Sequence, residues 1–425
     1  MRIKLLKDKN FGLLMWGKFV SLVGTQMQNF ALSLYVFKIT GSATKFATVL
    51  MISMLPQLLL GPIVGVFTDW MDRKKIIVSM DILNGLIIGV YAVLFYLNGG
   101  LSLGSIYLFV ILLSLISMIF QPAIATVIPS IVKKEDLVDA NSMNTFIMNI
   151  GNLISPMIAG ALFGIYGLFI ILILNSISFI LSGISEMFID IPKINKAPEE
   201  ISFKTFSRDL KEGLSFIKNS NILISVIRIA MIVNFVGNPL GSIGFIYISK
   251  NILGVSDLQY GIVEGVASLG MLLSPVICSA MAKKYPLKKL LFYNLLGTGF
   301  LIMLVAIVPF KPFLNLFNSN FVPYIALIVV NFFMILLMSV VNISLSIMFQ
   351  QTVPLNLMGR VNTVMSAGCM ATMPLGQLVF GVMYDKISTS LCVVISASII
   401  IVSLLAFKNT LLPKDSKDRE LALQV

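Results

Sequence analysis

Long apolar stretches, separated by short polar segments, constrain the fold of this chain more than any other feature of its sequence. Twelve such stretches can be distinguished, and each is long enough for the roughly 20 residues with which a helix crosses a bilayer core. The sequence therefore predicts an all-α polytopic membrane protein with twelve transmembrane helices. The stretches cover residues 11–37, 45–68, 76–97, 103–128, 140–164, 167–189, 222–249, 258–281, 287–309, 321–347, 361–384 and 388–407.

Composition excludes a soluble protein and several kinds of chemistry. Hydrophobic residues make up 57% of the 425 residues and charged residues only 12%, which is about half the usual share in soluble chains. The chain has no histidine, so histidine-assisted catalysis, histidine zinc sites and histidine proton relays are excluded. Its three cysteines lie far apart in apolar stretches, and no G-x-x-x-x-G-K-[ST] run is present. We therefore expect no enzymatic activity, cofactor, metal or ATP site on this chain.

Membrane topology explains the formal net charge of +12 better than nucleic-acid binding does. With the N-terminus inside, 24 of the 31 Lys and Arg residues fall in cytoplasmic segments and five fall outside. This asymmetry follows the positive-inside rule, and it predicts a protein of the cytoplasmic membrane with both termini in the cytoplasm. No basic domain remains that could bind nucleic acid. The five external lysines are Lys38, Lys45, Lys250, Lys311 and Lys386.

Similar features recur about half a chain apart. Residues 35–38 resemble residues 247–250, and the pair Lys74-Lys75 resembles Lys288-Lys289, at offsets of 212 and 214 residues. The longest polar stretch separates the two halves. We predict two parallel six-helix repeats, an arrangement that permits alternating access to a site near the membrane midplane and is typical of transporters; chance similarity is the alternative. The predicted parts are a first bundle, a cytoplasmic linker, a second bundle and a cytoplasmic tail, over residues 1–189, 190–221, 222–407 and 408–425.

A charged motif follows the second apolar stretch. Gly65 and Asp69 are spaced i, i+4 at the predicted helix end, and the cations Arg73 and Lys74 come shortly after them. The run resembles the signature G-x-x-x-D-x-x-G-R-[RK]-[RK] of the major facilitator superfamily, which the whole chain also resembles in helix number, duplication and linker. Asp72 stands where the common pattern has glycine, a substitution familiar in the drug-exporter branch that includes macrolide efflux proteins.

The resemblance implies that this motif is a cytoplasmic latch in a major facilitator fold. In that family the aspartate meets cations and the start of the eleventh helix when the transporter faces outward. Asp69 is therefore expected to dock near Arg360, since the positive end of a helix dipole attracts a carboxylate. The alternative is that Arg73 and Lys74 only set the topology.

The fifth apolar stretch contains small residues around a proline. Residues 151–160 read GNLISPMIAG, which resembles the antiporter motif G-x-x-x-G-P-x-x-G-G with Ser155 and Ala159 in place of two glycines. Because small residues let helices approach closely, Pro156 and Gly160 are candidate conformational residues; plain helix packing is the alternative. The fourth stretch lacks the arginine that proton-coupled drug exporters often carry, so the resemblance alone does not imply proton coupling.

Few ionisable residues lie inside the apolar stretches. Glu264 lies about two turns into the eighth stretch, and it is the leading candidate for ion coupling because an intramembrane carboxyl group can carry a proton through an alternating-access cycle. The alternative is a solvated carboxylate that faces an external vestibule. Asp81, Glu186 and Asp385 lie nearer predicted helix ends, where we expect them to be hydrated.

Uncharged amides are more numerous in the first, fourth, seventh and tenth stretches, which line the central cavity according to the family resemblance. Among Phe, Met and Ile residues they would form an adaptable, weakly polar site for bulky amphipathic compounds. Interhelical hydrogen bonding is the alternative for each amide. The candidates are Gln26, Gln28, Asn29, Gln121, Asn234, Asn238, Asn331 and Asn342.

Together these features predict a monomeric secondary transporter in the lipid bilayer that exports hydrophobic or amphipathic compounds, such as macrolides, in exchange for H+. Export of a native amphiphile, such as a siderophore or a lysolipid, is a second interpretation because the same amides would accept it. A non-transporting membrane receptor that kept the fold is an alternative of another class.

Overall fold

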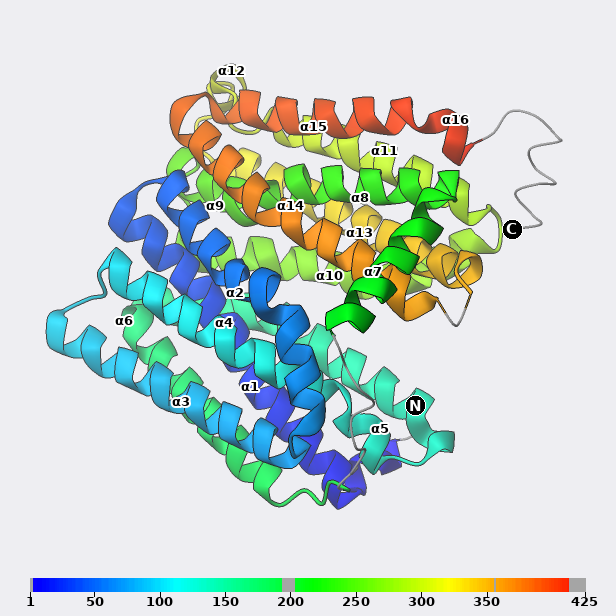
Figure 1. Cartoon of the computed structure of the whole chain (residues 1–425). Coiled ribbons are helices and arrows are strands. Elements are labelled where there is room, and N and C mark those ends of the chain that lie inside the picture. Colours follow the sequence, from blue (N-terminus) through cyan, green and yellow to red (C-terminus); the bar gives the residue numbers. More distant parts are fainter. Residues whose placement is uncertain (1–2, 193–202, 355–356, 413–425) are drawn as a thin grey trace. The chain divides into compact units, whose positions relative to one another are not determined.

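The described part of the chain is helical. The computed structural model describes residues 3–192, 203–354 and 357–412, including all side chains there except those of residues 3–4, 62–63, 65–70, 203–210 and 221. Within these ranges every regular element is a helix and there is no strand, which confirms the predicted all-α architecture (Figure 1).

The helices follow one another with short connections. The first group comprises α1 (Lys9–Thr40), α2 (Ala43–Trp70), α3 (Arg73–Asn98), α4 (Leu103–Ala125), α5 (Val127–Ile131) and α6 (Leu137–Met187). Then come α7 (Phe203–Lys218), α8 (Asn221–Pro239) and α9 (Phe245–Tyr247), with the π-helical turns Leu240–Gly244 and Ile248–Ile252. The last group comprises α10 (Asp257–Ala282), α11 (Leu287–Val305), α12 (Lys311–Leu314), α13 (Phe321–Thr352), α14 (Met358–Lys386), α15 (Thr389–Ala406) and α16 (Lys408–Leu411).

Most residues of each predicted apolar stretch lie on these helices, although the stretch 287–309 continues past the end of α11 at Val305. Ten helices of the described residues are long and apolar enough to cross a membrane. The helix α1, whose middle carries Gln26, Gln28 and Asn29, is not among them, and α6 alone covers the fifth and sixth stretches. Within α6 the backbone leaves the helical conformation at Gly167, where φ is 72° and ψ is −165°. The number twelve and the two repeats therefore stay predictions.

Local capping groups set several helix ends. The Asp8 carboxylate accepts a hydrogen bond of 3.0 Å from a backbone N–H in the first turn of α1, and Gly41 ends α1 in the left-handed conformation with φ of 58°. At the start of α3 the Asp72 carboxylate accepts hydrogen bonds from the backbone N–H groups of Lys74 and Lys75, at 3.0 and 3.3 Å. The aspartate that replaces the motif's glycine is therefore the N-cap of α3.

The chain forms two compact units. Unit 1 contains Met1–Gly41, Val49–Glu200 and Ser256–Gly265, and unit 2 contains Ser42–Thr48, Ile201–Val255 and Val266–Val425. Most of α2 thus belongs to unit 1 but its start belongs to unit 2, whereas the first turns of α10 belong to unit 1.

Close helix packing builds unit 1. The long helix α6 packs against α1 and α3, and α3 packs against α4. Glycines on α1 and α3 permit this approach, since a Cβ atom at Gly17 would lie 2.7 Å from Ser185 Oγ and one at Gly85 would lie 2.8 Å from Ile180 Cγ1. In unit 2, α8 packs on α14 and α15, and α11 packs on α13 and α15.

The linker predicted for residues 190–221 contains a helix. The described side chains of α7 include Ile217, which is buried with Leu223 and Val361 in one apolar cluster of unit 2. Figure 1 shows α7 in green and α14 in orange, and the two helices are in contact. The second half of α7 is thus part of the folded unit 2, because its apolar residues pack on the start of α14.

Candidate functional site

The charged motif lies at the junction of α2 and α3. Gly65 and Asp69 belong to the last turns of α2, but their side chains lie outside the described residues, so the docking of Asp69 stays a prediction. Arg73 and Lys74 form the first turn of α3 behind the Asp72 cap, and both are half-buried.

Arg360 has a partner that sequence reasoning did not find. It lies in the first turn of α14, and its guanidinium forms an ion pair with the Glu212 carboxylate of α7. The next residue, Gly213, allows the two helices to touch, because a Cβ atom there would lie 2.7 Å from the Arg360 carbonyl oxygen. The sequence signal for this contact is the helical spacing of apolar residues in the linker, such as Leu210, Leu214 and Ile217.

The small residues of the fifth stretch face the first turns of α10. A Cβ atom at Gly160 would lie 2.5 Å from the carbonyl oxygen of Asp257, and one at Gly261 would lie 2.5 Å from the carbonyl oxygen of Pro156. A Cβ atom at Gly265 would lie 2.6 Å from Met157 Cγ. The segment around Pro156 and Gly160 therefore packs closely on α10. In this contact Gly160 faces the backbone of α10, and Gly261 of α10 faces the backbone at Pro156. All of these residues belong to unit 1.

Glu264 lies on the same helix, between the contact residues Gly261 and Gly265. Its side chain is half-buried and accepts a hydrogen bond from the hydroxyl of Tyr260, which is only 4% exposed. The Tyr260 ring in turn stacks on Phe30 of α1, with 5.1 Å between ring centroids and 18° between ring planes. Tyr260 therefore connects the candidate coupling residue Glu264 to α1, the helix that carries three of the candidate amides.

The candidate amides of unit 1 differ in their hydrogen-bond partners and in their exposure. Gln26 Nε2 donates to Asn152 Oδ1 of α6 at 2.7 Å, and Asn29, which is exposed, donates to Gln26 Oε1 at 3.4 Å. Gln28 is buried and accepts a hydrogen bond of 2.8 Å from Asn175, so it joins α1 to α6. Gln121 is exposed on α4.

Two amides of unit 2 share a small cavity. Asn234 of α8 and Asn342 of α13 line a space of about 40 Å³, together with apolar residues that include Leu291 and Leu295 of α11. A drug-sized ligand needs about 300 to 1,000 Å³, so this cavity suits at most a water molecule or a small polar group. Asn331 is buried elsewhere on α13.

Asn238 belongs to a polar cluster rather than to that cavity. The fully buried Gln377 of α14 donates from Nε2 to Asn238 Oδ1 and to Ser242 Oγ, the latter at 2.8 Å. Ser242 Oγ also donates to the Asn238 carbonyl oxygen at 2.9 Å. This cluster links α14 to the junction of α8 and the first π-helical turn.

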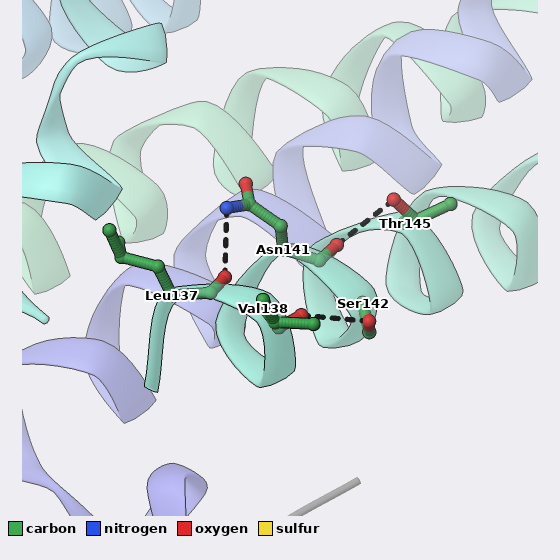
Figure 2. Close-up of a pocket in the computed structure, with 5 residues that line it drawn as sticks. All are labelled: Leu137, Val138, Asn141, Ser142 and Thr145. Carbon is green, nitrogen blue, oxygen red and sulfur yellow. Dashed lines mark hydrogen bonds between the residues drawn. The ribbon is translucent and has the colours of Figure 1, made fainter. Parts of the chain in front are cut away.

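A shallow depression of about 600 Å³ lies over the first turns of α6. Figure 2 shows its described lining residues, in which Asn141, Ser142 and Thr145 donate to carbonyl oxygens of their own helix at 2.8 to 2.9 Å. Leu137 and Val138 complete this lining. The side-chain donors drawn are thus engaged within the helix, and the described lining of the depression has no converging polar groups of the kind that fix a ligand.

Two carboxylates that we expected at hydrated helix ends are buried instead. Asp81 of α3 and Glu186 of α6 are 0% and 2% exposed. Both Asp81 oxygens, Glu186 Oε2 and the nearby Ser182 Oγ have no hydrogen-bond partner among the described atoms. The expectation was wrong because the bundle packs laterally over both positions: Gly183 brings α6 within contact of Asp81 Cβ.

The chain matches one family model and shares its fold with a solved transporter. The family described as "Transmembrane secretion effector" matches residues 4–424. The chain is 22% identical over 388 residues to Macrolide efflux protein A of Streptococcus pyogenes, which covers 91% of this chain and 92% of that protein. It is 26% identical over 376 residues to the uncharacterized MFS-type transporter YfiS of Bacillus subtilis (strain 168), covering 87% and 85%. The nucleoside transporter NupG has a similar fold, with a TM-score of 0.75 at 13% identity over 95% and 99% of the two chains.

Proposed function

This chain belongs to the transmembrane secretion effector family of the major facilitator superfamily, and from that premise we propose that it exports amphipathic compounds of the macrolide kind by proton antiport. As a member it is a multi-pass membrane transporter. The proposal concerns what it carries, in which direction and with which ion.

The observation that carries the proposed coupling is the position of Glu264. A carboxyl group on a membrane-spanning helix is energetically costly, so one that is present there is a candidate for function. This one is half-buried and hydrogen-bonded to a buried tyrosine. A proton that binds the carboxylate would weaken the hydrogen bond that it accepts from Tyr260, because the bond would lose its charge assistance. Loading and release of the proton would thus change how α10 is held against Phe30 of α1.

The proposed substrate class rests on polarity and on one relative. Gln26 is half-buried and Asn29 is exposed on α1, so these amides are accessible on an otherwise largely apolar helix. Such a surface suits a bulky, partly apolar compound better than a sugar or an inorganic anion. The similarity to Macrolide efflux protein A makes macrolides the first class to test.

Uptake into everted vesicles tests this function. Vesicles enriched in the full chain should accumulate a radiolabelled macrolide when the lumen is acidic, and a protonophore should abolish the uptake. Absence of protein-dependent uptake for macrolides, siderophores and lysolipids alike would contradict export and favour the receptor interpretation. Binding without flux would favour it as well.

A further inference from the structure

The start of α2 is held by a residue from the far end of the chain. The carboxylate of Asp385, near the end of α14, accepts hydrogen bonds from the Ser42 hydroxyl at 2.6 Å, the Ala43 backbone N–H at 2.8 Å and the Thr44 backbone N–H at 2.9 Å. All four residues belong to unit 2. The sequence placed Asp385 at a hydrated helix end, and it is indeed exposed, but its partners were not foreseen.

The contact has the electrostatics of a docking site for a helix end. The first N–H groups of a helix have no partner within the helix, and the helix dipole makes that end positive. A carboxylate that accepts two of these N–H groups and a hydroxyl therefore forms charge-assisted hydrogen bonds. One residue thereby fixes the first turn of α2 on the end of α14.

The surface of α14 is shaped to receive this turn. A Cβ atom at Gly381 would lie 3.3 Å from Thr44 Cα and would overlap Ala47 Cβ. Thr44 Oγ1 also donates to the Gly381 carbonyl oxygen at 3.3 Å. The glycine lets α2 come close enough for Asp385, one turn further along, to reach its N–H groups.

The helix keeps a cap of its own if Asp385 departs. Ser42 Oγ accepts a hydrogen bond of 3.3 Å from the backbone N–H of Lys45, which is a local N-cap. This cap can keep the first turn helical, although it does not replace the bonds that Ala43 and Thr44 donate to Asp385. In addition, only Ser42–Thr48 of this helix belongs to unit 2, whereas the remainder belongs to unit 1.

We propose that Asp385 is the anchor of a gate, whose bond to the first turn of α2 forms in one half of the transport cycle and breaks in the other. Asp385 is a positioning residue, since it acts through α2 and not on the substrate. The gate rests on the proposed alternating-access transport, but it requires no particular substrate or coupling ion.

Cysteine labelling tests the gate without any transport assay. In the full chain with Cys278, Cys369 and Cys392 replaced by alanine, Thr44→Cys places a thiol at the half-buried seam beside Gly381. The probe is a membrane-impermeant maleimide, applied to purified protein in detergent. Asp385→Asn should raise its rate of labelling about tenfold, because hydrogen bonds to a charged group are replaced by weaker ones. Lys45→Cys, which is exposed on the same turn, is the matched control and should label at the same rate with and without Asp385→Asn.

A second variant disturbs the contact between α14 and the first turn of α2 sterically. Gly381→Ala keeps the carboxylate but adds the Cβ atom that overlaps Ala47, so it should also accelerate labelling of Thr44→Cys, even if Asp385→Asn does not fold. Unchanged labelling in every folded variant would overturn the gate. An equal acceleration at Lys45→Cys would overturn it too, because the first turn would then simply unravel.

The labelling experiment can succeed or fail independently of the proposed transport function. Labelling needs no gradient and no transported compound, and the substitution Glu135→Gln at an exposed residue should leave it unchanged. A chain without macrolide uptake can therefore still show the gate, and a chain with uptake can lack it.

Discussion

The carbonyl oxygen of Asp257, the first residue of α10, lies 2.5 Å from the place that a Cβ atom at Gly160 would occupy. A real Cβ atom cannot sit so close to a backbone oxygen. The contact therefore depends on the missing side chain, and it brings α6 against the helix that carries Glu264.

Gly160→Ala should accordingly impair transport much more than Gly164→Ala, the same substitution one helical turn away. The added methyl group must push α10 from α6, and we expect at least a tenfold loss of substrate uptake, consistent with the effect of small misplacements near a functional site. Gly164→Ala is the matched control, because a Cβ atom there would lie 3.7 Å from Asp257 Cβ, an ordinary contact. Equal uptake by the two variants in vesicles would refute a role for this close approach.

The cap at Asp72 should contribute to stability rather than to transport. Asp72→Ala removes the acceptor of two backbone N–H groups and should cost about 1 kcal/mol, whereas Asp72→Gly should cost only about a few tenths. Thermal unfolding in detergent measures the difference. An unchanged melting temperature of Asp72→Ala would contradict a stabilising role of this N-cap.

The ion pair between Arg360 and Glu212 should contribute little by itself. The two side chains are 33% and 42% exposed, and such pairs are worth about 0 to 1 kcal/mol. Gly213→Leu should weaken the docking of α7 far more, because its side chain would strike the Arg360 backbone. Limited proteolysis within the linker reports on docking, and greater cleavage of Glu212→Gln than of Gly213→Leu would contradict this ranking.

Sequence reasoning succeeded where local periodicity and composition decide the outcome. The helical spans follow from runs of apolar residues, and the approach of helices around Pro156 and Gly160 follows from small residues at helical spacing. Asp385 could not be paired with Ser42 in this way, since the two are more than 300 residues apart and no local pattern links them. Asp81 and Glu186 were misplaced for a similar reason: their burial depends on which helices cover them laterally.

The buried carboxylates Asp81 and Glu186 should destabilise the folded protein. Both Asp81 oxygens and one Glu186 oxygen lack a hydrogen-bond partner among the described atoms, and an unpaired buried charge is destabilising. Asp81→Asn combined with Glu186→Gln should therefore leave the melting temperature unchanged or raise it, while each amide preserves the size of its side chain. A marked fall in melting temperature would indicate that the pair holds a cation or shares a proton that the fold requires.

Macrolide uptake into everted vesicles, driven by an imposed pH gradient, tests proton coupling at Glu264 most directly. Glu264→Gln should abolish gradient-driven accumulation but retain substrate exchange, because the amide cannot carry a proton. Tyr260→Phe, which removes only the hydroxyl bonded to Glu264, should shift the pH dependence of uptake, and the exposed Glu135→Gln should behave like the parent protein. Full gradient-driven accumulation by Glu264→Gln would contradict the assignment of Glu264 as the proton carrier.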